Sequence, residues 1–157
     1  MSDLFVDGNL KVTFAPAIAN INAPTTTELN AGTSLETLIT PTGLQIKPTT
    51  ASVDTSNLAS TFTTSAAGRR SFAITVEMKR QTPTDTAFNL LPYKTTGYLV
   101  VRRNLAATTA WASTQNVEVY PVTVGEPELA PPAANEVQKF TSSMMVTTDP
   151  APRAVIA

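Results

Sequence analysis

The chain contains no cysteine and no histidine. Without cysteine there is no disulfide bond and no thiolate ligand for a metal. Without histidine, Ser–His–Asp and Cys–His nucleophilic sites are excluded, together with most zinc and iron sites. The chain also lacks a Walker A loop, a GxGxxG turn, an SxxK motif and a DxDxDG calcium loop. We therefore expect a protein that is not an enzyme and that carries no cofactor and no metal.

Charged side chains are also scarce. They make up 15% of the residues, and the formal net charge is −1, whereas typical soluble domains carry about 25% charged residues. No cluster of Lys and Arg is present of the kind that attracts nucleic acid or an anionic membrane. Because few charges oppose self-association, this composition favours a protein that assembles with itself.

The few charges that stand together have an ordinary explanation. Paired carboxylates can act in glycoside hydrolysis, and paired arginines can contact phosphate. Isolated acids are usually solvated loop charges, and arginine doublets in a chain of low net charge usually form salt bridges or end strands, so we favour these explanations. The acidic pairs are Asp3 with Asp7 and Glu126 with Glu128, and the basic doublets are Arg69–Arg70 and Arg102–Arg103.

Long apolar runs are missing as well. None approaches the roughly 20 residues that a membrane-spanning helix needs. The N-terminal segment carries acids where a signal peptide needs a basic start. We expect a protein made in the cytoplasm, without export by the usual route and without a membrane partner.

The pattern that is present predicts β-strands. Apolar and polar residues alternate in Ser71–Arg80, around Leu10–Phe14 and in Val137–Thr147, which places one face of each strand in a core. Gly97–Arg103 has a continuous apolar run, as expected for a strand covered on both faces. Val117–Gly125 is rich in β-branched residues but contains Pro121, which predicts an edge strand or a bulge or bend at the proline.

One short helix is predicted over Pro83–Leu91. Thr82 is its expected N-cap, with Pro83 at the first helical position and Asp85 at the capping-box spacing. Its apolar residues lie on one side, so packing against the sheet must hold it in place.

Two connections are long for a compact domain, residues 15–32 and 40–70, and residues 149–157 resemble an extended tail. The second connection contains spaced apolar residues that cannot form a core alone, so we expect it to be disordered in a free subunit and ordered against a neighbour. Trp111 either anchors a partner or covers the chain's own core. The candidates for contacts between subunits are Ile46, Val53, Leu58, Phe62 and Trp111.

The order of several segments resembles the major tail tube proteins of long-tailed (siphovirus-like) bacteriophages, especially those of actinobacteria. The similar segments are Ala23–Glu36 (APTTTELNAGTSLE), Ser65–Arg80 (SAAGRRSFAITVEMKR), Gly97–Arg103 (GYLVVRR) and Val117–Phe140 (VEVYPVTVGEPELAPPAANEVQKF). They are collinear and cover most of the chain, although none is a catalytic fingerprint.

The resemblance implies a single domain over residues 1–157, a β-sandwich or small barrel with one short flanking α-helix. It also implies that the long loops 15–32 and 40–70 bridge neighbouring subunits. It implies a structural virion protein, assembled in the host cytoplasm, whose hexameric rings stack into the tail tube. Strands of all subunits would join in one inner β-barrel, through which double-stranded DNA passes without specific binding. The other implied partners are the tape measure, tail terminator and distal tail proteins.

In such a tube the apolar face of each strand packs on its own subunit, because water fills the channel. The polar faces of Ser71–Arg80 and Val137–Thr147 then become candidates for the channel wall, with Glu118 added if its strand joins the barrel. These candidates are Thr75, Glu77, Lys79, Glu118, Lys139, Thr141 and Ser143. The alternative is that they coat the outside of an ordinary sheet. The alternative function is an immunoglobulin-like β-sandwich that decorates or binds a surface.

Overall fold

The structure, a computed structural model, describes residues 1–157. Nine strands form one antiparallel sheet in the order β2-β1-β5-β6-β8-β4-β3, with β7 on β8 and β9 on β6. The strands are β1 (Lys11–Ala15), β2 (Thr33–Ser34), β3 (Ile39–Asp54), β4 (Ser65–Lys79), β5 (Thr96–Arg102), β6 (Asn116–Val124), β7 (Glu128–Leu129), β8 (Lys139–Val146) and β9 (Ala151–Val155). The end strands β2 and β3 do not pair with each other, so the sheet is not closed. The predicted mainly β fold is confirmed.

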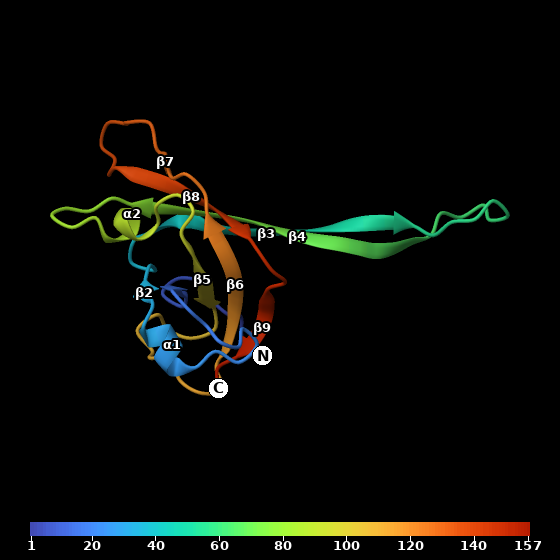
Figure 1. Cartoon of the computed structure of the whole chain (residues 1–157), viewed down its shortest axis with the longest axis horizontal. Helices are drawn as coiled ribbons and strands as arrows, with labels where there is room; N and C mark the ends of the chain where they lie inside the picture. Colours follow the sequence, from blue (N-terminus) through green and yellow to red (C-terminus); the bar gives the residue numbers. More distant parts are fainter.

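One face of the sheet encloses the larger of two apolar cores. The β5–β6 part of the sheet runs across the β3–β4–β8 part, so the same face curves around one interior (Figure 1). Alternate residues of β4 and β8 point into it in matching register, with Ile74 opposite Met144 and Met78 opposite Phe140. The buried members of this first core are Val12, Phe14, Leu35, Leu38, Ile74, Val76, Met78, Ala87, Leu91, Leu99, Val101, Tyr120, Val122, Val124, Phe140 and Met144.

The second core lies on the other face of the sheet, over β1, β5, β6 and β9. It contains Val100 of β5, whereas Leu99 and Val101 belong to the first core. This explains the continuous apolar run of β5, which was predicted to be covered on both faces. The buried members of the second core are Ala15, Ile18, Leu29, Val100, Trp111, Val117, Val119, Ala151, Ala154 and Ile156.

Pro121 lies where β6 changes one of its two neighbours. Before the proline β6 pairs with β9, and after it with β8, while β5 accompanies the strand on its other side. The Pro121 carbonyl accepts a hydrogen bond from the backbone N–H of Thr147, in the connection between β8 and β9. A proline without an N–H therefore stands at a junction in the ladder, not at an outer edge of the sheet.

The structure has two short helices, α1 (Thr26–Asn30) and α2 (Thr86–Leu90), where the sequence predicted one. The predicted Thr82 cap is wrong, because α2 begins after Asp85. The Asp85 carboxylate is drawn back to Arg80, whose Nε lies 2.7 Å from Oδ2, and does not cap the helix. The predicted apolar side is confirmed: Ala87 is buried, and the Phe88 ring packs edge-on against Phe140 at 5.2 Å between centroids.

Residues 40–70 differ most from the expected irregular loop. They form most of a long β3–β4 hairpin that projects far beyond the body of the protein (Figure 1). The sequence of β3 does not show the alternation of a strand, because β3 contains Pro41 and Pro48 and its outer half has no buried side chain. Both prolines are tolerated because β3 is an edge strand, whose second side needs no ladder hydrogen bonds.

The other two segments also carry more internal structure than expected. Residues 15–32 include α1, and they bury Ile18 and Leu29 in the second core. Thr25 and Glu28 close a capping box at the start of α1. The expected tail 149–157 contains β9, which pairs with β6 and buries Ala154 and Ile156. These segments therefore use their apolar residues mainly within the subunit.

The outer half of the hairpin contributes nothing to either core, which gives a direct test. Every residue from 51 to 67 is exposed, and Thr50 pairs with Arg70. We expect replacement of residues 51–69 by Asn-Gly, a turn suited to two-residue hairpins, to leave the melting temperature within about 4 °C of the parent, equivalent to about 1 kcal/mol. Calorimetry measures this difference. A much larger loss would mean that the arm supports the body.

Candidate functional site

Six of the seven expected channel residues lie together on one face of the sheet. Register pairs them directly across β4 and β8: Thr75 with Ser143, Glu77 with Thr141, and Lys79 with Lys139. All six are half-buried. Since residues opposite one another in an antiparallel pair project to the same side, they make one continuous polar surface, which we call the β4–β8 polar face.

Neighbouring strands extend this face on both sides. On β3, Gln45 lies opposite Thr75, and on β7, Glu128 lies opposite Thr141. The Thr40 hydroxyl donates to Glu77 Oε1 at 2.8 Å. Gly43 makes this approach possible, because a Cβ there would stand 2.5 Å from the Glu77 carbonyl oxygen. The result is a four-stranded patch, β3-β4-β8-β7, that nothing in the subunit covers.

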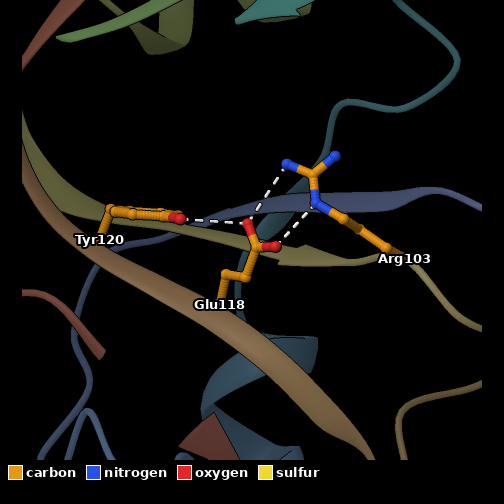
Figure 2. Close-up of polar contacts among 3 residues, drawn as sticks. All are labelled: Arg103, Glu118 and Tyr120. Carbon is orange, nitrogen blue, oxygen red and sulfur yellow. Dashed lines mark hydrogen bonds and ion pairs between the residues drawn. The ribbon is translucent and has the colours of Figure 1, made fainter. Parts of the chain in front are cut away.

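Glu118 is not part of this face. It shares the side of β6 that carries Tyr120, a member of the first core. Figure 2 shows the Glu118 carboxylate between two partners: Arg103 Nε donates at 2.7 Å, and the Tyr120 hydroxyl donates at 3.1 Å. Alternation along β6 could have revealed this, because Glu118, Tyr120 and Val122 are spaced by two.

The Arg103–Glu118–Tyr120 cluster is electrostatically self-contained. The hydrogen bond that Arg103 donates to Glu118 raises the pKa of Arg103. Burial, followed by the negative charge of Glu118, raises the pKa of Tyr120. Both shifts favour the protonated Arg103 and Tyr120 that donate the hydrogen bonds drawn in Figure 2, so we assign the cluster a role in holding β5 to β6.

Arg102 and Arg70 also have structural partners. Arg102 is fully buried, and its guanidinium donates to the carbonyls of Ala106, Thr109 and Ala110 and to the Gln115 side chain. Burial lowers the pKa of Arg102. It therefore organises the β5–β6 connection. On the arm, Arg70 pairs with Asp149.

The acidic pairs found in the sequence lie in exposed positions: Asp3, Asp7, Glu126 and Glu128. No three Asp or Glu side chains lie close enough together to hold a metal ion. Of the pairs, only Glu128 joins the β4–β8 polar face, through its position opposite Thr141. Sequence reasoning missed this, because β7 is two residues long and no periodicity can be read from it.

The residues expected at subunit contacts divide into two groups. Val53, Leu58 and Phe62 lie in the outer part of the arm and are 50%, 105% and 74% exposed. Ile46 packs partly against the first core. Trp111 is 7% exposed in the second core, with the Lys11 ammonium 5.3 Å and the Arg102 guanidinium carbon 5.0 Å from its ring centroid. Of its two expected roles, Trp111 covers its own core.

A family model described as a phage tail tube protein matches residues 1–157 of the chain. The chain belongs to the phage tail tube protein family. The resemblance read from the four sequence segments is thereby confirmed, and the protein is a structural component of the virion tail.

The fold of this tail tube protein is similar to that of a chain from a solved structure, the cryo-EM structure of the anti-feeding prophage baseplate, 6-fold symmetrised. The two chains are 11% identical with a TM-score of 0.61, over 96% of this chain and 95% of the other. At this identity the likeness concerns the fold alone. No curated protein matches the chain. None of its helices is long and apolar enough to cross a membrane.

The tyrosine of the cluster gives this tail tube protein a predictable response to pH. Unfolded tyrosine ionises near pH 10, whereas the raised pKa of Tyr120 keeps the folded phenol protonated to higher pH. Above about pH 10 only the unfolded state loses this proton, so stability falls as pH rises. We expect the free energy of unfolding of the wild type to fall more steeply than that of Tyr120→Phe between pH 9 and about 11. Denaturant titrations measure both, and parallel profiles would contradict the assignment.

Proposed function

We propose that the protein polymerises as stacked hexameric rings into a tail tube that conducts DNA from capsid to host, and that the β4–β8 polar face lines its channel. The observation that carries the proposal is the in-register polar surface on β3, β4, β8 and β7, left uncovered in a chain of the tail tube family. The alternative is the solvated outer face of an ordinary antiparallel sheet.

The strand count supports a channel of suitable width. Six copies of a four-stranded patch would give a barrel of about 24 strands. With strands about 4.8 Å apart and tilted by about 45°, the backbone circle would be roughly 50 Å across. Side chains would leave about 40 Å, which is wide enough for duplex DNA.

The edges of the patch support closure by neighbouring copies. β3 is unpaired on its outer side along its whole length, and β7 is unpaired on the side away from β8. Such edges are prone to pair with another chain, and a closed barrel removes them. Pairing the β3 edge of one copy with the β7 side of the next would continue the polar face from subunit to subunit.

The chemistry of the face suits passage without capture. A wall rich in Lys and Arg would hold the phosphates of DNA. Here two acidic side chains, Glu77 and Glu128, and three basic ones, Lys47, Lys79 and Lys139, accompany neutral ones. The other implied partners, the tape measure, tail terminator and distal tail proteins, would meet the inside or the ends of such a tube.

The absence of cysteine makes the position of the face easy to test. We expect Thr75→Cys tubes to react with a small maleimide but not with a maleimide coupled to a polymer too large to enter the channel. The same variant as free subunits should react with both reagents, which is the matched control. Reaction of assembled tubes with the bulky reagent would place this face on the outside.

The arm is expected to hold neighbouring subunits together. Its exposed apolar residues Val53, Leu58 and Phe62 have no partner within the subunit, and burying them would stabilise an assembly by about 1.5–3 kcal/mol for each.

We expect the chain with residues 51–69 replaced by Asn-Gly to stay folded but to form no tubes in negative-stain electron microscopy. The triple substitution Val53→Ser, Leu58→Ser, Phe62→Ser keeps the arm and should also impair assembly. Normal tubes from both variants would exclude the arm from subunit contacts, and strictly monomeric wild-type protein at high concentration would favour an immunoglobulin-like module.

A further inference from the structure

On β4, β8 and β7 the charges of the polar face are sorted into two rows that run across the strands, while Lys47 lies apart on β3. Lys79 and Lys139 lie directly opposite each other. One step along the same face, Glu77 and Glu128 lie on either side of Thr141, each opposite it on a different strand. Positions two residues apart along a strand are separated by about 7 Å. We call these the lysine row and the acid row.

Within the isolated subunit the lysine pair is only partly compensated. Like charges directly opposite each other in an antiparallel pair are destabilising. Lys79 forms no ion pair, and Lys139 pairs only with Glu136, at 3.3 Å between Nζ and Oε2. No ion pair joins the lysine row to the acid row, although they are neighbours on one face. The cost of the lysine pair therefore points to a negatively charged partner that arrives from outside.

We propose that this partner is the phosphate backbone of duplex DNA, and that the two rows act against each other on it. The lysine row attracts passing phosphates, and the adjacent acid row keeps that attraction too weak to retain them. The inference rests on the proposed function, because it requires the β4–β8 polar face to line the channel.

The distances make such a balance effective. The Debye length is about 8 Å at physiological ionic strength, which is comparable to the 7 Å between the rows. A phosphate at the wall therefore feels both rows at once. Around a ring of six subunits each row would hold about 12 charges, so removing the acid row leaves about 12 lysine charges facing a polyanion.

The test compares wild-type tubes with tubes carrying Glu77→Gln and Glu128→Gln. Tubes are incubated with a short duplex, treated with nuclease to remove DNA bound outside, and sedimented. We expect the double variant to retain at least tenfold more protected DNA than wild type at 50 mM salt. Because binding to phosphates weakens steeply with salt, this retention should disappear above about 200 mM.

Two further variants supply the controls. Adding Lys79→Gln and Lys139→Gln to the double variant should return DNA retention to the wild-type level. Asp3→Asn with Asp7→Asn removes the same number of negative charges from an exposed segment away from the face, and should leave retention unchanged. If the double variant fails to assemble, Glu128→Gln alone can be used. This substitution removes half of the acid row at an exposed position without a hydrogen-bond partner. We expect its tubes to retain less DNA than those of the double variant, still in a salt-sensitive way.

The outcomes separate this inference from the proposed function. Suppose that the Thr75→Cys tubes react only with the small maleimide, but the acid-row variants retain little DNA. This result would overturn the inference about the two rows and leave the channel assignment intact. Equal retention in the Asp3→Asn, Asp7→Asn control would also overturn it, because any lost negative charge would then suffice. Labelling by the bulky reagent would overturn both.

Discussion

The pairing register of β4 with β8 is the constraint on which the other features depend. It places Ile74, Met78 and Phe140 on the side of the first core, and the polar residues between them on the other side. Because side chains alternate along a strand, a slip by one residue would exchange the two faces completely. One choice of register therefore fixes both the main core and the surface proposed as channel wall.

The two ends of the sheet have different surroundings. Over β1, β5, β6 and β9 both faces are covered, and the second core and the buried Arg102 make that part self-sufficient. Over β3, β4 and β8 only one face is covered, and the edge strand continues into an exposed arm. The polar face and the arm thus belong to the same half of the molecule. In the proposed tube, this half would supply the surfaces that contact neighbouring copies and the channel.

The low charge content of the edge strand β3 agrees with a role of this half of the molecule in assembly. A protein that leaves a long edge strand unpaired usually protects it with charged side chains or bulges. Here β3 carries one lysine and one aspartate along its 16 residues, together with two prolines. Few charges therefore protect this edge, although the two prolines and the two register shifts against β4 interrupt it. In the proposed tube, a neighbouring copy would pair with part of this edge.

The sequence by itself determined the faces of the strands, the double coverage of β5 and the absence of thiol and imidazole chemistry, because these follow from period and residue type over a few neighbouring positions. It also carried the family resemblance. Only the tertiary structure decided that residues 40–70 form a hairpin and that Glu128 lies beside Thr141. Both depend on pairing with a strand that has no readable pattern: β3 is exposed on both faces in its outer half, and β7 has only two residues. Local periodicity assigns a side chain to a face of its own strand, whereas the register between strands decides which side chains share a surface.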